Sequence, residues 1–515
     1  MANSSSEVDE RARLEARLTD QWWRLNNLYY IKDKNGRKVL FRLNWAQTEL
    51  VDGMHNYNVI LKSRQLGFTT FCMIYFLDAC LFNSHHATGV VAHTREAAED
   101  LFRNKIRFAY DNLPAWLRAQ VKARSETARM LEFANGSTIA VGTSLRSGTF
   151  QKLLISEYGK VSVREPEKAV EIKTGALNTI ASGQQIFIES TAEGQAGEYY
   201  DIVQRARELQ SSGIELTTMD PKFFFFPWYR EKQYALPDNQ VGSVSVPDDT
   251  RRYFEELEAK FGIKLTAGQK AWYVKKKEEQ GEHMLREYPS TPDEAFRGSM
   301  EGTFFSREIK KARADGRVCY VPYESSRMVD TFWDLGNDGM SVWFFQHIGL
   351  EYRFIDHYRG TNIGGLPAMA KILRDKGYIY GTHHFPWDGG NSSIQTDKGT
   401  KQIAEELGIR PVKIVPRTKD KKLSIEKCRP VLNRAKFDSV KCADGIKSLE
   451  SYRKKWNASV GEWTDEPLHD KSSHDADSFR TFSDGYEGRN SELVGGAYNN
   501  GVDVFADTDY DVLGI

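Results

Sequence analysis

Residues 59–70, VILKSRQLGFTT, combine side-chain types that could hold a polyphosphate. An apolar run leads into a turn with Lys62, Arg64 and Gly67, and two threonines and the helix-like segment FCMIYFLDACLF follow. In such a unit, N–H groups at the helix N-terminus point at the anion, a cation neutralises it and a hydroxyl ligates Mg²⁺. The match to G-x-x-x-x-G-K-[ST] is imperfect, with Lys62 at the first glycine and Phe68 at the lysine. Alone, the stretch is equally typical of an ordinary strand–turn–helix in a core.

Two later strands end in polar side chains that would complete a nucleotide-hydrolysis site. QKLLISEYG (151–159) ends on Glu157, and GQQIFIESTAEG (183–194) ends on Ser190 and Thr191. A carboxylate in such a place positions Mg²⁺ or polarises the attacking water, and a hydroxyl senses the γ-phosphate. The alternative for Glu157 is a surface acid that happens to follow a strand.

A second group of carboxylates lies late in the chain. VDTFWDLG ends on Asp334, THHFPWDGG ends on Asp388, and SSHDADSFRTFSDG is a helix with Asp475 and Asp477. Three carboxylates brought together repel one another unless divalent cations neutralise them, and two cations about 4 Å apart can hydrolyse a phosphodiester. An early strand acid, a middle strand-end acid and a late helix acid is the order seen in RNase H-like nucleases. Any single aspartate, by contrast, is usually a turn or cap residue.

The elements that must position these groups follow from periodicity. Residues 1–30 are predicted to be helical, and Asn-Gly pairs at 35–36 and 135–136 predict hairpins. In the part of the chain before residue 220, short apolar strands alternate with helices and end in polar residues. This pattern predicts a parallel α/β sheet with its ligand along one edge. Residues 220–310 show less periodicity and are rich in aromatic residues, whose side chains are expected to lie in a core. The strand pattern restarts after Pro322.

The composition limits the class of protein. A chain of 515 residues predicts two or three domains, and 40% hydrophobic with 28% charged residues is typical of a soluble globular protein. No run of 18 apolar residues occurs, so no transmembrane helix is expected, and the polar N-terminal stretch is not expected to be a secretion signal. Five scattered cysteines without a C-x-x-C pair favour a reducing cytosol. The net charge is zero, but residues 417–455 are strongly basic and could contact nucleic acid or form a solvated face.

Taken together, the chain resembles the large terminase subunit of tailed bacteriophages, the motor that packages DNA into the procapsid. The resemblance rests on SRQLGFTT as the phosphate loop, LLISEYGK as the acidic strand end and IFIESTAEG as the coupling strand, and covers roughly residues 40–485. It implies a P-loop (RecA/ASCE-like) parallel-sheet ATPase domain with a lid, followed by an RNase H-like α/β nuclease domain. The implied divisions are residues 1–220 (ATPase core with N-terminal helix), 221–315 (lid or linker), 322–485 (nuclease) and 486–515 (acidic flexible tail).

The resemblance also implies roles in the first domain. Glu157 would be the catalytic carboxylate, and Arg146 would be an arginine finger for a neighbouring subunit's ATP. Ser156 departs from the family, which usually has an aspartate before the glutamate, and this weakens the expected Mg²⁺ affinity. The residues implied to bind ATP and its Mg²⁺ are Gln47, which would read adenine, Lys62 or Arg64 as the cation, Ser63, Gln65, Gly67, Thr69 as the Mg²⁺ ligand, Thr70, and the coupling residues Ser190 and Thr191.

In the second domain, the motif match makes Asp334, Asp388 and Asp477 the metal ligands, for Mg²⁺ or alternatively Mn²⁺. Asp475 is an alternative to Asp477, Asp338 is an auxiliary candidate, and His474 could orient a ligand. The implied partners are double-stranded DNA, a small terminase subunit and the portal protein, on which the chain would form a homo-oligomeric ring in the host cytoplasm, without a membrane. The tail would dock on the portal or be idle.

Two other interpretations stay open at this point. A helicase–nuclease of DNA repair or defence would use the same two chemistries, although it would need more motor motifs and a second RecA-like sheet. A decayed prophage relic that only binds DNA or a portal would need neither activity. Intact Thr69, Glu157, Asp334, Asp388 and Asp477 argue against the relic.

Overall fold

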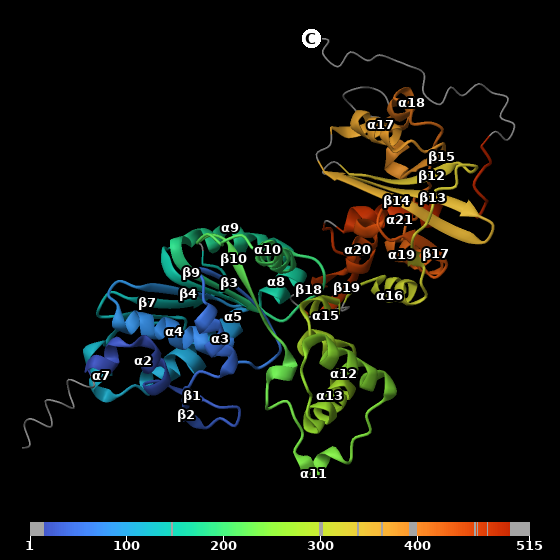
Figure 1. The fold of residues 1–515 in the computed structure, drawn as a ribbon. Helices are drawn as coiled ribbons and strands as arrows, with labels where there is room; N and C mark the ends of the chain where they lie inside the picture. The colour runs from blue at the N-terminus through green and yellow to red at the C-terminus, as the bar shows by residue number, and fades with distance from the viewer. Residues whose placement is uncertain are drawn as a thin grey trace, which may run out of the picture. The chain divides into compact units, whose positions relative to one another are not determined.

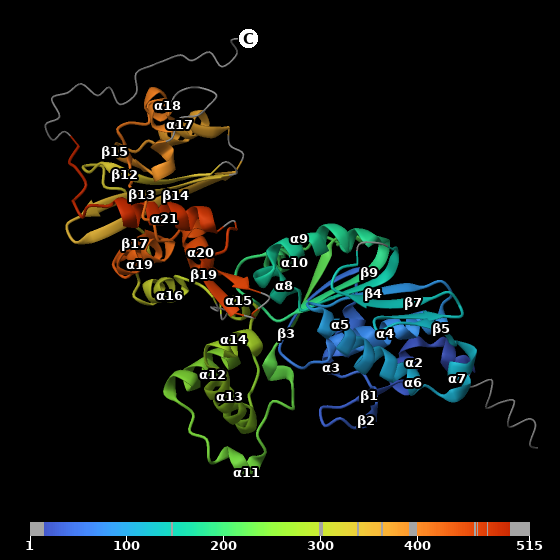
Figure 2. The same cartoon turned by 180° about the vertical axis from the view of Figure 1, so that it is seen from behind.

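The computed structural model describes residues 15–145, 148–297, 302–336, 339–361, 364–390, 399–457, 460, 462–470 and 472–494. The chain divides into two compact units, Met1–Ser299 and Met300–Ile515 (Figures 1 and 2). Within the described residues, no helix is both long enough and apolar enough to cross a membrane.

The first unit is built on an eight-stranded sheet with the order β10-β3-β9-β8-β4-β7-β6-β5, parallel from β10 through β7. Since β9 lies between β3 and β8, the strand that leads into the phosphate loop, the coupling strand and the acidic strand are direct neighbours. This is the parallel P-loop sheet that the sequence predicts. The strands are β3 (Tyr57–Lys62), β4 (Ala87–Val91), β5 (Ala123–Glu126), β6 (Met130–Phe133), β7 (Thr138–Gly142), β8 (Phe150–Ser156), β9 (Ile180–Ser190) and β10 (Pro221–Phe226).

Helices cover both faces of this sheet (Figure 1). Successive strand residues alternate between the two cores, so that Ile60 packs in one and Leu61 in the other. Burial on both faces explains why these strands read as continuous apolar runs. One face is covered by α2 (Gln21–Asn27), α3 (Trp45–Gly53), α4 (Phe68–Phe82), α5 (Arg95–Leu101), the π-helix η1 (Phe102–Arg107), α6 (Phe108–Asp111) and α7 (Ala115–Gln120), and the other by α8 (Tyr158–Arg164), α9 (Pro166–Gly175) and α10 (Glu198–Ser212).

Local predictions in this unit are confirmed at the two hairpins. The Asn-Gly pair at 35–36 joins β1 (Tyr30–Lys32) to β2 (Lys38–Leu40), and the pair at 135–136 joins β6 to β7. Both glycines have a left-handed backbone, with φ of 74° and 80°. Of the helix predicted over residues 1–30, the part before residue 15 lies outside the described residues.

Strand β10 shows that the first sheet continues past the domain boundary predicted at residue 220. The run that begins at Pro221 pairs in parallel with β3, with Phe224 opposite Ile60. Four consecutive phenylalanines hide the period of a strand. A proline is tolerated here because it is the first residue of an edge strand.

Residues 227–297 form a smaller helical part of the first unit with its own aromatic core (Figure 1). Trp228, Tyr234, Phe254 and Tyr273 are buried in it, as the core interpretation of these aromatic residues predicts. Its helices are η3 (Trp228–Arg230), α11 (Asp238–Val241), α12 (Asp248–Phe261), α13 (Ala267–Gln280), η4 (Gly281–His283), α14 (Met284–Glu287) and α15 (Pro292–Arg297).

A carboxyl group on α15 makes this helical part sensitive to pH. Glu294 Oε1 accepts a hydrogen bond from Tyr253 OH at 2.8 Å, and Oε2 accepts one from Ser290 N at 3.3 Å. Burial raises the pKa of Glu294 to about 7. Because the pKa of Glu294 is higher in the folded protein than in the unfolded chain, binding of this proton stabilises the folded state. The stabilisation is complete below the ordinary glutamate pKa and is lost as the pH rises to about 7.

We therefore expect Glu294→Gln to flatten the pH dependence of unfolding. Between about pH 5 and about pH 8 the free energy of unfolding should fall by about 2 kcal/mol more in the wild type than in the variant. This is less than the full value for the pKa shift, because Glu294 is partly exposed to solvent. Denaturant melts at the two pH values measure this difference. Asp293→Asn, which changes the exposed neighbouring acid, should keep the wild-type slope, and an equal slope for Glu294→Gln would contradict the assignment.

The second unit contains a seven-stranded sheet with the order β11-β17-β14-β13-β12-β15-β16. Three antiparallel strands, β12 to β14, are extended by parallel strands on either side, which is the predicted RNase H-like α/β arrangement. The strands are β11 (Val318–Cys319), β12 (Val329–Leu335), β13 (Gly339–Ile348), β14 (Glu351–Thr361), β15 (Tyr380–Phe385), β16 (Val412–Ile414) and β17 (Ala435–Asp438).

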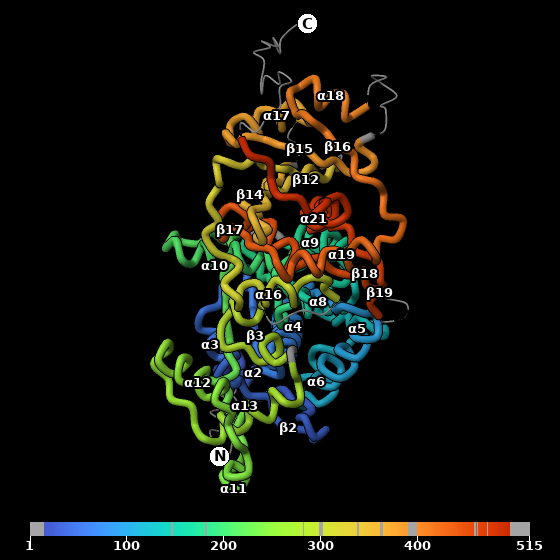
Figure 3. Tube along the Cα trace, turned by 90° about the vertical axis from the view of Figure 1, so that its right-hand side faces the viewer, coloured from blue at the N-terminus to red at the C-terminus, as the bar shows by residue number. Residues whose placement is uncertain are grey.

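Helices cover this sheet on both faces too (Figure 3). One core gathers α16 (Ser306–Ala314), α19 (Lys421–Leu432), α20 (Ala443–Ser451) and α21 (Ser473–Gly485), and the other gathers α17 (Gly365–Lys376) and α18 (Thr400–Glu406). A short hairpin, β18 (Lys454–Asn457) and β19 (Glu462–Pro467), lies apart from the sheet. Because α16 and β11 belong to this unit, it begins before the predicted residue 322.

Candidate active sites

The phosphate loop, residues 62–70, connects β3 to α4 at the carboxyl edge of the first sheet. Gln65 and Gly67 have left-handed backbones, with φ of 61° and 78°. Helix α4 begins after Gly67 without a side-chain cap, so its first N–H groups are available to an anion. A Cβ added at Gly67 would come within 2.8 Å of Gln47 Nε2, which explains the need for glycine there.

The hydroxyls and the cation around this loop converge on one carboxylate, Glu189, near the end of β9. Lys62 Nζ lies 2.6 Å from Glu189 Oε2. Thr69 Oγ1 and Ser156 Oγ donate to Glu189 Oε1 at 2.6 and 2.7 Å. Burial alone would raise the pKa of Glu189, but Lys62 and the two hydroxyls hold it below its ordinary value. Glu189 is not among the sequence-predicted site residues, because the polar strand end falls at Ser190, although a charged residue in the apolar run IFIES already requires a partner.

Glu157 stands at the first residue after β8, where sequence reasoning predicts the catalytic carboxylate. It has a left-handed backbone (φ 55°, ψ 38°) at the start of α8, a conformation that is costly for a residue with a side chain. Its Oε1 lies 3.8 Å from Lys62 Nζ, and its Oε2 is buried with no hydrogen-bond partner among the described residues. Glu157 is thus held beside the loop with an oxygen left over for a ligand or water.

The structure separates the two candidate cations of the loop. Lys62 faces the carboxylates Glu189 and Glu157, whereas Arg64 forms an ion pair with Glu287 on α14. The Glu287 contact raises the pKa of Arg64. Glu287 in turn contacts Arg286. Lys62 is therefore the cation that lies inside the site, and Arg64 ties the loop to α14.

Gln47 is hydrogen-bonded to the phosphate loop in this structure. Its Nε2 donates to Gly67 O at 2.9 Å, and its Oε1 accepts from Asn44 N at 3.1 Å in a capping box at the start of α3. The side chain is almost fully buried and braces the phosphate loop. Reading of an adenine edge by Gln47 stays a prediction.

The other residues predicted to bind the nucleotide and its Mg²⁺ differ in whether their side chains are already hydrogen-bonded. Ser190 Oγ accepts a hydrogen bond from Gly159 N at 3.0 Å. Ser63 Oγ and Thr191 Oγ1 are buried and have no partner among the described residues. Thr70 follows Thr69 in the first turn of α4, and Arg146 lies outside the described residues. Hydroxyl and carboxylate oxygens are the donors that Mg²⁺ prefers, so the residues around the loop fit a nucleotide-bound Mg²⁺.

In the second unit, Asp334 lies at the end of β12 and accepts a hydrogen bond from His474 Nδ1 at 2.8 Å. Burial, together with the charges of Asp477 and Asp388, raises the pKa of Asp334 to about 6 against the lowering effect of His474. Asp334 thus lies near enough to Asp477 and to Asp388 for its charge to interact with theirs. Asp388 lies in a short helical turn, η5 (Trp387–Gly390), beyond the end of β15. Asp338 lies outside the described residues.

Asp475 and Asp477 have different partners in the structure. Asp475 is fully buried and pairs with Arg359 at 2.8 Å and His357 at 3.1 Å, so its carboxylate is already engaged, and its role as a metal ligand stays a prediction. Two positions later on α21, Asp477 points elsewhere, and its Oδ1 lies 2.6 Å from Arg480 NH1. Among the described residues, however, no three or more His, Cys, Asp or Glu side chains are arranged to hold a metal ion. The aspartates fit divalent cations in type but are not assembled as a ligand set.

The basic stretch 417–455 is partly neutralised within its own unit. Lys422 and Lys454 pair with Asp465, and Lys427 pairs with Asp484. Much of the stretch is thus a solvated, ion-paired face. An exception beside Asp388 is Arg417, whose guanidinium lies 4.4 Å from the ring centroid of the exposed Trp387.

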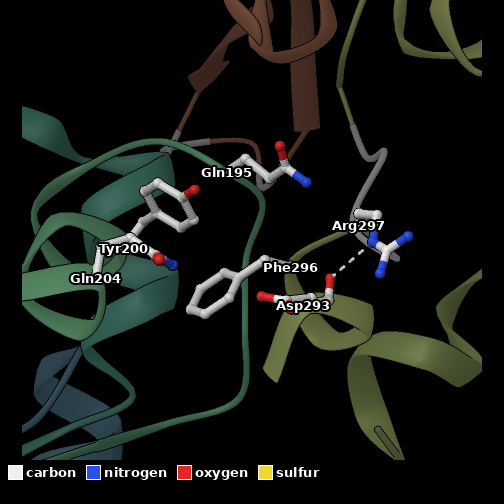
Figure 4. Close-up of a pocket in the computed structure, with 6 residues that line it drawn as sticks. All are labelled: Gln195, Tyr200, Gln204, Asp293, Phe296 and Arg297. Carbon is white, nitrogen blue, oxygen red and sulfur yellow. Dashed lines mark hydrogen bonds between the residues drawn. The ribbon is translucent and has the colours of Figure 1, made fainter. Parts of the chain in front are cut away.

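A pocket of about 250 Å³ in the first unit lies away from these groups (Figure 4). It lies between α10 and α15, and no predicted site residue lines it. Its lining residues are Gln195, Tyr200, Gln204, Asp293, Phe296 and Arg297.

Comparison with solved structures finds phage large terminases. The HK97 bacteriophage large terminase aligns with a TM-score of 0.43 and 11% identity over 91% of this chain and 98% of that one. A large terminase from a thermophilic bacteriophage aligns with a TM-score of 0.30 and 11% identity over 86% and 98%. The cobalt-bound large terminase nuclease of thermophilic phage G20c aligns with a TM-score of 0.26 and 12% identity over 36% and 97%.

No model of a known protein family matches the chain, and comparison with curated proteins gives no match. At TM-scores and identities this low, the structural similarities transfer no function. The assignment of function depends on the chain's own residues.

Proposed function

We propose that the first unit hydrolyses ATP at the carboxyl edge of its parallel sheet. The observation that carries this proposal is the convergence of Lys62, Thr69 and Ser156 on Glu189, with Glu157 beside them. These groups surround an uncapped helix N-terminus, which is the arrangement that binds polyphosphate. An ordinary strand–turn–helix of a core has no reason to bury a carboxylate and a lysine beside a second carboxylate at this point.

Each residue would have a distinct part in hydrolysis. The loop N–H groups and Lys62 would bind the phosphates, and Ser63 and Thr191 would use in the same site their hydroxyls, which have no hydrogen-bond partner among the described residues. Glu157 would orient the attacking water and polarise it through its free Oε2. Mg²⁺ carried by the nucleotide would neutralise the charge that develops on the phosphates. The paired backbone of β8 and the left-handed backbone of Glu157 would fix the Glu157 carboxylate relative to the loop.

We further propose that the second unit cuts DNA with Asp334, Asp388 and Asp477. The support is the RNase H-like strand arrangement and the interaction of the Asp334 charge with those of Asp388 and Asp477. Binding of Mg²⁺ or Mn²⁺ would require the three carboxylates to come closer together than they are in this structure.

The combination supports a phage-type DNA-packaging motor: ATP hydrolysis would drive double-stranded DNA into a procapsid, and the nuclease would cut a concatemer to start and finish packaging. The proposed partners are double-stranded DNA, a small terminase subunit and a portal protein, with a homo-oligomeric ring forming on the portal in the host cytoplasm. Among the described residues there is one parallel P-loop sheet, without the second sheet of that kind that would favour a helicase.

Two substrates separate these functions in one experiment. ATP-dependent displacement of a third strand from a linear triplex reports movement along duplex DNA, and displacement from a forked duplex reports strand separation. We expect the purified chain to release phosphate from ATP and to displace the third strand only. Forked-duplex displacement would support the helicase, and absence of phosphate release with retained DNA binding would support an inactive relic.

A further inference from the structure

Strand β8 ends on Ser156, whose side chain is a hydroxyl and not a carboxylate. The neighbouring strand β9 presents Glu189 directly opposite Ser156 in the parallel register. Ser156 Oγ is 2.7 Å from Glu189 Oε1, so the glutamate of β9 brings its carboxylate to the end of β8.

We propose that Glu189 is the carboxylate that positions the Mg²⁺ of the bound nucleotide, in place of an aspartate at position 156. This inference depends on the proposed ATPase function of the first unit. Glu189 acts as a positioning residue through the hydroxyl of Thr69, and Glu157 is left to act on water. Of the two carboxylates beside the loop, Glu189 thus serves the metal and Glu157 the attacking water.

The hydrogen-bond directions support this division. Thr69 Oγ1 donates its proton to Glu189 at 2.6 Å, so the lone pairs of that hydroxyl are turned away from Glu189. A hydroxyl held in this way presents an oxygen to a cation, and outer-shell partners of this kind fix the orientation of ligands. Mg²⁺ keeps several waters, which a nearby carboxylate can also hold.

A structural ion pair with Lys62 does not by itself explain the arrangement. Lys62 is buried and contacts Glu189 Oε2, which would satisfy a purely structural pair. The other oxygen, Oε1, accepts from two hydroxyls on two different elements, α4 and β8. Glu157 differs from Glu189 because it is partly exposed and its contact with Lys62 is longer, at 3.8 Å against 2.6 Å.

The test compares Mg²⁺ titrations of the full chain with a fluorescent ADP analogue as probe. In Glu189→Gln we expect the half-saturating Mg²⁺ concentration to rise about 10- to 100-fold, the usual effect of losing an outer-shell partner, with metal-free analogue binding unchanged. In Glu157→Gln the Mg²⁺ titration should match the wild type. An unchanged Mg²⁺ titration in a folded Glu189→Gln protein would overturn the proposal.

Moving the carboxylate gives the sharper test. The double variant Ser156→Asp with Glu189→Gln returns a carboxylate to β8, and we expect it to recover most of the Mg²⁺ affinity. A merely structural role for Glu189 predicts no recovery. If Glu189→Gln fails to fold, Glu189→Asp shortens the reach by one methylene and should still weaken Mg²⁺ binding, whereas wild-type Mg²⁺ affinity in Glu189→Asp would contradict the proposal. Failure of the ATPase proposal itself would appear differently, as a wild-type chain that binds no analogue at any Mg²⁺ concentration.

Discussion

Replacing Glu157 with glutamine is expected to lower the rate of ATP hydrolysis by about 10²- to 10⁴-fold, the usual contribution of a positioned base. Affinity for ATP should stay near the wild-type value, because the loop N–H groups and Lys62 that would bind the phosphates are untouched. The structural reasons for this expectation are the strained backbone of Glu157 and its Oε2, which accepts no hydrogen bond from the part of the chain that the structure describes. Phosphate release at saturating ATP measures the rate, and a titration with the non-hydrolysable analogue measures the affinity.

The matched control for this variant is Glu167→Gln. Glu167 lies in the exposed first turn of α9, away from the residues of the site, and its loss should change neither rate nor affinity. Hydrolysis in Glu157→Gln within a few-fold of the wild type would show that another residue activates the water. Equal losses of rate and affinity would mean that Glu157 binds the nucleotide instead.

The second large effect is expected at Asp477. Asp477→Asn should reduce metal-dependent linearisation of supercoiled plasmid by more than the roughly 10- to 100-fold typical of an outer-shell partner, since the group lost is a proposed ligand. ATP hydrolysis should be unchanged, because Asp477 belongs to the second unit. Plasmid cutting with Mn²⁺ or Mg²⁺ and phosphate release, measured on the same preparation, give both results.

The control must account for Arg480, which loses its ion-pair partner in this variant. A thermal melt of Asp477→Asn shows whether the unit stays folded. Asp444→Asn removes an exposed acid in the first turn of α20 and should cut like the wild type. Full cutting by a folded Asp477→Asn protein would remove this residue from the active site.

The sequence was most informative where local pattern decides the structure. The strand ends at Glu157 and Asp334 were predictable because short apolar strands followed by polar residues mark the carboxyl edge of a sheet. The hairpins were predictable from their Asn-Gly pairs, since only a few residue types accept the left-handed turn. Such signals need no knowledge of what lies across the fold.

The site features that could not be predicted are those that depend on side-chain partners far away in the sequence. Whether Lys62 or Arg64 is the cation of the site depends on Glu287, more than two hundred residues further along the chain. The buried role of Asp475 depends on His357 and Arg359. Likewise, Glu189 stands out only when its neighbours on α4 and β8 are known.

The claim that the phosphate loop binds a nucleotide is tested most directly by the affinity of the full chain for ATPγS. Gly67→Ala places a methyl group against Gln47 in a left-handed turn of the loop, whereas Gly213→Ala imposes the same left-handed strain at a place where no described residue lies within 4 Å. We expect tight binding by the wild type and by Gly213→Ala, and at least about 10-fold weaker binding by Gly67→Ala because the anion-binding N–H groups are displaced. Wild-type affinity in Gly67→Ala, or no binding by the wild type, would contradict the account.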